Sequence, residues 1–147
     1  EKSDIFKLKY NKKSINIVDE SYNSNPLSLK FAIDKFNKMK ISKKSKNVLL
    51  GDMLELGKSS KKLHIDAAKI INKSNLNKVY VLGKHIRSTF NKIKTQKKGT
   101  ILRNKKDIKD LIVNQLNNNE YLMVKASNGT GINNIISKIK VRGINAI

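Results

Sequence analysis

Two acids, a phenol and two amides lie close together near the start of the chain, in the stretch Val18-Asp19-Glu20-Ser21-Tyr22-Asn23-Ser24-Asn25-Pro26. Asn25 is a good helix N-cap, because its side-chain oxygen can accept a hydrogen bond from a free first-turn amide. Pro26 suits the first helical position, where the helix needs no N–H donor. Carboxylates beside a helix N-terminus suit a ligand that combines hydroxyl groups with negative charge. The polar side chains of this first loop are Asp19, Glu20, Tyr22, Asn23 and Asn25.

Two more polar loops follow apolar runs later in the chain. Asp52 and Glu55 come after one run, and Lys125, Ser127 and Asn128 come at the end of another. In an open parallel sheet, ligands bind beyond the carboxyl ends of the strands. Acids, amides and a lysine gathered there could bind ribose hydroxyls, a carboxylate and an ammonium group. Simpler interpretations remain open, since Asp52 could be a turn residue and Lys125 a surface charge.

Other signals for a site are weaker. Gly83-Lys84-His85 could form a fourth loop at the same edge, and His64 is expected on a helix flank as a packed or solvated residue. Gly129-Thr130-Gly131 is glycine-rich but lacks the dinucleotide-binding fingerprint. The sequence contains no G-x-x-x-x-G-K-[ST] phosphate loop, no cluster typical of a metal site and no Ser-His-Asp arrangement. The chain therefore shows no machinery of its own for holding a triphosphate.

Apolar runs and helical periodicities alternate along the chain and must position these loops. Strands are predicted over 5–10, 14–18, 48–50, 79–82, 100–102 and 121–124. Helices are predicted from Pro26 onward and over 59–73, 86–93, 107–116 and 132–139. Strands that alternate with helices indicate right-handed βαβ units and a parallel sheet covered on both faces. The predicted fold is a Rossmann-like three-layer α/β/α sandwich with a mostly parallel sheet and an N-terminal β-hairpin.

The bulk composition limits the class of protein. A chain of 147 residues is long enough for one domain with its own core, and we expect a single domain over 1–147. There are no cysteines, which fits a reducing, cytoplasmic location. No apolar run approaches the roughly 20 residues that cross a membrane. Because the chain begins with Glu1-Lys2-Ser3, we interpret it as a piece of a longer protein.

The net charge of +21 raises the alternative of a nucleic-acid-binding module. Only Arg87, Arg103 and Arg142 are arginines among the 32 basic residues. A specific nucleic-acid reader should use more arginine, because its guanidinium bonds in a fork to guanine and phosphate. The lysines are spread over every segment among many Asn and Ile residues, which is the pattern of AT-rich codon usage. We therefore do not expect a nucleic-acid partner, and the charge remains compatible with anionic small substrates.

Four strings closely resemble the C-terminal domain of the Mur ligase family: DESYNSNP, VLLGDMLELG, VYVLG and VKASNGTG. The usual strings of the family's D-alanyl-D-alanine-adding member look like DDSYNANP, LGDMxELG and KGSRGM, in the same order. The resemblance covers almost the whole chain. It implies a ligase of cell-wall peptidoglycan biosynthesis that uses ATP and Mg²⁺ to join D-Ala-D-Ala to UDP-MurNAc-tripeptide. Another amino acid ligase of the family is the remaining alternative within this resemblance.

The resemblance also implies roles for individual residues. The nucleotide-binding residues would be Asp19, Glu20, Tyr22, Asn23 and Asn25, and the acceptor-binding residues Asp52, Glu55, Lys125, Ser127 and Asn128. Central and N-terminal domains would supply the phosphate loop, the magnesium ligands and the UDP site, so this domain alone would hold no metal and be inactive. Glu20 stands where the family usually has aspartate, Asn128 where it has arginine and Ala126 where it has glycine.

Overall fold

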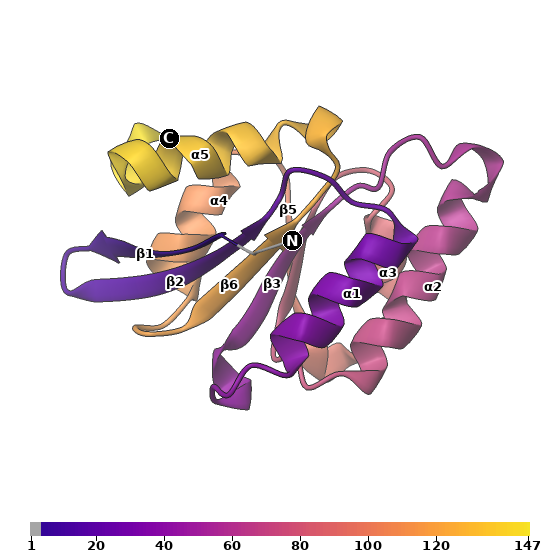
Figure 1. The fold of residues 1–147 in the computed structure, drawn as a ribbon, viewed down its shortest axis with the longest axis horizontal. Coiled ribbons are helices and arrows are strands. Elements are labelled where there is room, and N and C mark those ends of the chain that lie inside the picture. Colours follow the sequence, from indigo (N-terminus) through magenta and orange to yellow (C-terminus); the bar gives the residue numbers. More distant parts are fainter. Residues whose placement is uncertain (1–3) are drawn as a thin grey trace.

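The computed structural model describes residues 4–147 and contains a six-stranded sheet (Figure 1). The strands are β1 (Asp4–Tyr10), β2 (Lys13–Glu20), β3 (Lys46–Gly51), β4 (Val79–Leu82), β5 (Lys98–Leu102) and β6 (Tyr121–Lys125). Their order across the sheet is β1-β2-β6-β3-β4-β5. Only the β1-β2 hairpin is antiparallel, and all other neighbours pair in parallel. The last strand in the sequence, β6, therefore lies between β2 and β3.

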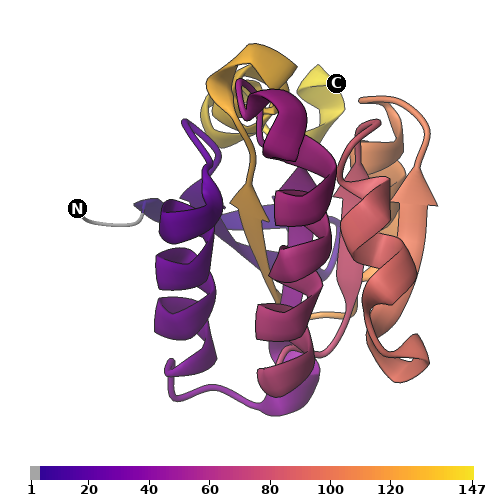
Figure 2. The same cartoon turned by 90° about the vertical axis from the view of Figure 1, so that its right-hand side faces the viewer.

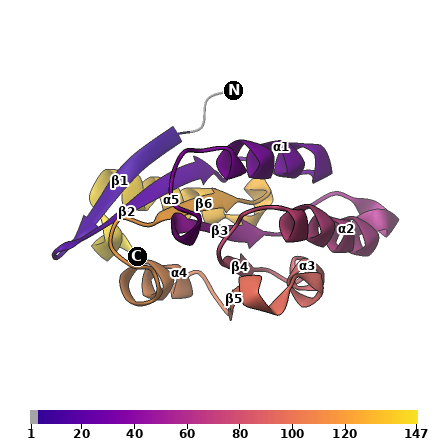
Figure 3. The same ribbon diagram turned by 90° about the horizontal axis from the view of Figure 1, so that it is seen from below.

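Helices cover both faces of the sheet. They are α1 (Pro26–Asn37), α2 (Ser60–Lys73), α3 (Arg87–Lys92), α4 (Asp107–Asp110) and α5 (Ile132–Arg142). Figure 2 shows α1, α2 and α3 side by side in front of the sheet. Figure 3 shows α4 and α5 on the other side of the strands. The predicted three-layer α/β/α fold with an N-terminal hairpin is confirmed.

Two hydrophobic clusters fill the spaces between the layers. One joins the side chains of α1, α2 and α3 to one face of the sheet, and the other joins α4 and α5 to the opposite face. In β3, Val48 and Leu50 belong to the first cluster and Leu49 to the second, and all three are fully buried. Such solid apolar runs are typical of parallel strands that are covered on both faces.

The start of α1 is as the sequence predicted. The Asn25 side-chain oxygen accepts a hydrogen bond of 2.8 Å from the backbone N–H of Ser28. The Ser28 hydroxyl oxygen accepts one of 3.0 Å from the backbone N–H of Asn25, so the two residues cap the helix reciprocally. Pro26 is the first helical residue. This cap fixes where the first polar loop ends.

Several predicted boundaries differ from the structure, and two of these differences concern β2 and α4. The predicted strand over 14–18 continues to Glu20, because Asp19 pairs with Asp4 of β1 and Glu20 pairs with Lys125 of β6. The predicted helix over 107–116 is α-helical for only one turn and then widens into a π-helical segment, Leu111–Gln115, in which the backbone N–H of Leu116 donates to the Leu111 carbonyl. Among residues 4–147, every helix is too short or too polar to span a lipid bilayer.

Candidate functional site

The three predicted polar loops meet where β2, β3 and β6 end, which we call the carboxyl edge of the sheet. Two pockets open there. The first, the α1 pocket, has a volume of about 360 Å³ and is lined in part by Glu20, Tyr22, Asn25, Leu27, Phe31 and Lys125. The second, the α5 pocket, has a volume of about 840 Å³ and is lined in part by Asp52, Leu54, Gly83, Lys105, Lys106 and Thr130. Both volumes are within the range of small-molecule sites.

Opposite charges lie next to each other in the α1 pocket. Glu20 and Lys125 are register partners on the neighbouring parallel strands β2 and β6, and both line this pocket. Lys125 is only 3% exposed, and its Nζ lies 5.6 Å from the ring centroid of Tyr22. The ring face attracts the ammonium group and fixes it at the pocket wall. The structure thus groups Lys125 with the first loop, whereas the resemblance placed it with the acceptor residues.

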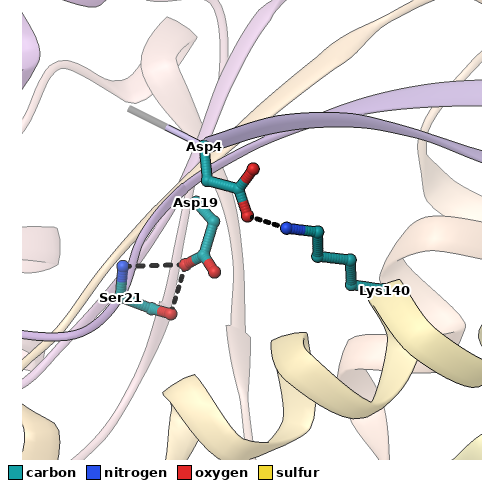
Figure 4. Close-up of polar contacts among 4 residues, drawn as sticks. All are labelled: Asp4, Asp19, Ser21 and Lys140. Carbon is teal, nitrogen blue, oxygen red and sulfur yellow. Dashed lines mark hydrogen bonds and ion pairs between the residues drawn. The ribbon is translucent and has the colours of Figure 1, made fainter. Parts of the chain in front are cut away.

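The two acids of the first loop point to opposite faces of the sheet. Successive side chains of a strand alternate in direction, and β2 includes both Asp19 and Glu20. Glu20 lies on the α1 side, whereas Asp19 lies on the side of α5 and accepts hydrogen bonds from the backbone N–H and the hydroxyl of Ser21 (Figure 4). Nearby, Asp4 pairs with Lys140 of α5. Of these two acids, Glu20 lines the α1 pocket and Asp19 does not. A nucleotide contact by Asp19 therefore stays a prediction.

The amides of the first loop also differ in their surroundings. Asn25 caps α1 and at the same time lines the α1 pocket. Asn23 is exposed between Tyr22 and the buried Ser24. Its predicted contact with a nucleotide is neither supported nor contradicted by this geometry.

Asp52 holds the loop after β4 through its carboxylate. Its Oδ1 accepts hydrogen bonds from the backbone N–H groups of His85 (2.9 Å) and Ile86 (2.7 Å), and its Oδ2 accepts one from Lys84 (3.2 Å). The carboxylate lies so close to Gly83 that a Cβ there would be 2.5 Å from Oδ1. Asp52 therefore shapes the α5 pocket, and its carboxylate already accepts three bonds.

Ser127 connects all three polar loops. Its hydroxyl donates to the Ser24 carbonyl at 3.0 Å and accepts from the Leu54 backbone N–H at 2.9 Å. Its own backbone N–H donates to the Asp52 carbonyl at 3.0 Å. The side chain is buried. Ser127 thus fixes the positions of the two pockets relative to each other.

Glu55 and Asn128 are exposed at the carboxyl edge. Glu55 has a φ of 62°, in the left-handed region, at the turn that leads towards α2. Neither side chain lines one of the two pockets. Their predicted contacts with an acceptor substrate stay predictions.

His64 lies inside the protein and supports the second loop. It is fully buried, and its Nε2 accepts a hydrogen bond of 3.1 Å from the Met53 backbone N–H. Nε2 therefore carries no proton, and Nδ1 donates to the Ser60 carbonyl at 2.7 Å. Both ring nitrogens form hydrogen bonds with the backbone, so His64 positions Met53.

Two groups of pocket residues were missed by the sequence analysis. Leu27 and Phe31 are 78% and 68% exposed and border the α1 pocket. Their spacing of four residues, opposite the buried face of α1, is a signal that could have identified them. Asn104, Lys105 and Lys106 line the α5 pocket and follow β5 after one residue, Arg103. Their position after a predicted parallel strand could have identified them as residues of the carboxyl edge.

The residues at the carboxyl edge combine charged, polar and apolar groups. Within residues 4–147, no group of three or more His, Asp or Glu side chains comes close enough to hold a metal ion. The α1 pocket combines a carboxylate, a phenol, an ammonium and apolar walls, a set that suits a ribose and a flat base.

Comparisons with known proteins agree with the resemblance. Residues 6–128 match the family described as "Mur ligase, glutamate ligase domain". The chain is 25% identical over 120 residues to the UDP-N-acetylmuramoyl-tripeptide–D-alanyl-D-alanine ligase of Rickettsia prowazekii and 26% identical over 128 residues to that of Bacillus subtilis. These alignments cover 82% and 85% of this chain but only 26% and 28% of the relatives, so the chain spans about a quarter of their length.

The fold also matches solved structures. The MurF ligase from Thermotoga maritima in complex with ADP superposes with a TM-score of 0.70 at 21% sequence identity. The match covers 94% of this chain and 30% of that protein. At this identity the likeness supports the fold, while the family is supported by the match over residues 6–128.

Proposed function

Because the chain belongs to the Mur ligase family, we propose that it is the C-terminal domain of a MurF-type ligase, which adds D-Ala-D-Ala to UDP-MurNAc-tripeptide in the cytoplasm. The observation that carries this proposal is that the family match over residues 6–128 includes the carboxyl ends of all five parallel strands. The two relatives named above carry this activity in their names. The proposal includes central and N-terminal domains in the same protein, which would bind Mg²⁺, the triphosphate and the UDP end.

We assign the α1 pocket to the nucleotide. The Glu20 carboxylate can accept hydrogen bonds from ribose hydroxyls. The rings of Tyr22 and Phe31 offer flat surface to a base, and Leu27 adds apolar surface beside them. Lys125 supplies a positive charge that is held in place by burial and by the Tyr22 ring. In this assignment Lys125 faces the anionic nucleotide, in place of the acceptor contact that the resemblance implied.

We assign the α5 pocket to the acceptor dipeptide. Leu54, Leu82 and Ile132 supply apolar walls that suit the methyl groups of two alanines. Lys105 and Lys106 supply charge for the free carboxylate of the dipeptide. The Lys105 ammonium lies against the backbone of Gly131, at the start of α5, where helix N–H groups add to the positive potential. These lysines are further acceptor-binding candidates beside Asp52, Glu55, Ser127 and Asn128.

In this mechanism the domain binds and orients the nucleotide and the acceptor dipeptide, and it excludes water from the reacting groups. ATP transfers its terminal phosphoryl group to the tripeptide carboxylate, giving an acyl phosphate and ADP. The amine of D-Ala-D-Ala then attacks the acyl carbon and releases inorganic phosphate as the amide forms. Closure of the carboxyl edge over the central domain would keep water from hydrolysing the acyl phosphate. Ser127 would let both pockets move as one unit, since it joins the loops that line them.

The test is ligation by the full-length protein. Purified protein is incubated with ATP, Mg²⁺ and UDP-MurNAc-tripeptide, together with D-Ala-D-Ala, D-alanine or D-glutamate, and phosphate release and product mass are measured. We expect product with D-Ala-D-Ala only, and none from the 147-residue chain alone. Product with a single amino acid only would assign the chain to another ligase of the family. A failure of all acceptors, combined with tight RNA or DNA binding at physiological salt, would favour a nucleic-acid-binding module.

A further inference from the structure

A third pocket lies at the opposite edge of the sheet, among the segments that lead into β3, β4 and β5. We call it the amino-edge pocket and define it by Lys43, Ser74, Leu76, Lys94 and Lys97. Its volume is about 310 Å³. Figure 2 shows these connecting segments together at the lower end of the molecule, away from the loops that follow the strands. The pocket is therefore separate from the two assigned above.

Lys97 is buried at this pocket with two carbonyl partners. It is only 6% exposed, and its Nζ donates to the carbonyls of Ser74 (2.9 Å) and Leu76 (2.8 Å). Carbonyl dipoles satisfy two of the three ammonium protons but bring no net negative charge. A buried charge is ordinarily paired with an opposite one, because removing it from water is costly.

The surroundings of Lys97 add further positive charge. The pKa of Lys97 is lowered, first by burial and then by the charges of Lys43 and Lys94. In the described residues 4–147, none of these three lysines forms an ion pair with a carboxylate. The residues that line the pocket include no acid. Three ammonium groups thus share one pocket without a counter-charge from the protein.

We propose that the amino-edge pocket binds a small phosphate-bearing anion, held by Lys43, Lys94 and Lys97. Near neutral pH orthophosphate carries one to two negative charges and has several acceptor oxygens, so one group can receive hydrogen bonds from more than one ammonium. Lysine binds phosphate as a point charge and needs no planar fork. The pocket is large enough for pyrophosphate as well as orthophosphate. The proposal is independent of the ligase assignment, because the pocket lies at the other edge of the sheet.

The test is a titration of the ¹⁵N-labelled 147-residue chain, whose sheet is covered on both faces by its own helices. Orthophosphate or pyrophosphate is added at constant ionic strength, and backbone amide shifts are followed. We expect saturable shifts at residues 74–77 and 94–97, with pyrophosphate binding more tightly than orthophosphate. Lys97→Met should weaken the affinity by about tenfold or more. Lys94→Met removes an exposed lysine and gives the same test if the buried substitution disturbs folding.

Lys138→Met is the matched control, because it removes an exposed charge on α5, away from the pocket. It should bind pyrophosphate like the unmodified chain. Shifts that rise without saturation, or equal affinity in Lys94→Met and Lys138→Met, would overturn the proposal. A single-stranded RNA that saturates the same amides while both phosphates fail to do so would also overturn it, in favour of a nucleic-acid surface.

Discussion

Ser127 and Asp52 were predicted to contact the acceptor, and in the structure both hold backbone segments together. The Ser127 hydroxyl joins residues 103 positions apart, and the Asp52 carboxylate joins its own loop to one 32 to 34 positions further on. The sequence indicated that the loops would meet, because parallel strands end at one edge. It could not show which polar atoms would bond to each other, since these bonds depend on side-chain directions at two distant positions.

Ser127→Ala should lower the free energy of unfolding by about 1–3 kcal/mol, because the Leu54 N–H would lose its buried acceptor. Urea denaturation monitored by circular dichroism measures the change. Ser137→Ala, on the exposed face of α5, is the control and should change stability by less than about 0.5 kcal/mol. Equal stabilities for the two variants would show that the Ser127 bonds contribute nothing.

Lys97 should make the free energy of unfolding rise as the pH is raised. Because its folded pKa lies below the ordinary value of 10.5, the folded chain releases this proton at a pH where the unfolded chain keeps it. Between these two pKa values the unfolded state binds more protons than the folded state. The contribution of Lys97 to the free energy of unfolding therefore rises with pH from the lowered folded pKa to the unfolded value of 10.5. Lys97→Met lacks this contribution. In phosphate-free buffer, the free energy of unfolding of the unmodified chain should therefore increase relative to that of Lys97→Met as the pH is raised. A constant difference would contradict the lowered pKa.

At the scale of elements, α1 has two apolar faces with different roles. Leu29, Ile33 and Phe36 pack against the sheet, whereas Leu27 and Phe31 are exposed beside the α1 pocket. A helix of a globular domain ordinarily buries one stripe and exposes polar residues elsewhere. The second face therefore supports the nucleotide contact that we propose for the α1 pocket.

Phe31→Ser in the full-length enzyme should raise the KM for ATP by about three- to tenfold, the range expected for losing one aromatic contact. The kcat should change less, because Phe31 would touch the base and not the reacting atoms. Val141→Ser removes a side chain that is 81% exposed on α5 and is the matched control. An unchanged KM in Phe31→Ser would separate this face of α1 from nucleotide binding.

The sequence predicted the boundaries of helices and strands correctly where neighbouring residues in the chain determine them. Asn25 and Pro26 gave the start of α1 to the residue, because a cap depends on neighbours in the chain. The end of β2 was missed by two residues, because Asp19 and Glu20 are held in the strand by partners in β1 and β6. The π-helical segment after α4 was also missed, since nothing in the types of Leu111–Gln115 distinguishes it from an α-helix.

At the scale of the whole molecule, the charge of +21 acts on the fold through repulsion among lysines. Lys30, Lys62, Lys69 and Lys140 are among the lysines that form ion pairs with aspartates. With 32 basic residues and 11 acidic ones, most of the basic side chains cannot have an acidic partner of their own. Dissolved salt should screen their repulsion, since the Debye length falls from about 30 Å at 0.01 M to about 8 Å at 0.15 M.

The thermal midpoint of unfolding should therefore rise as sodium chloride is increased from about 0.01 M to about 0.15 M, with most of the gain at the low end. Differential scanning calorimetry of the 147-residue chain in phosphate-free buffer measures the change. A midpoint that falls or stays constant over this range would show that mutual repulsion of the lysines does not limit stability.

The position of β6 between β2 and β3 also governs how the chain can fold while it is being synthesised. The hairpin formed by β1 and β2 and the parallel set β3-β4-β5 are made first, yet they share no strand pairing until Tyr121–Lys125 has left the ribosome. Until then each half exposes the strand edge that β6 will cover, and such edges can pair wrongly. A nascent chain therefore depends on β6 to join the loops that line the α1 pocket.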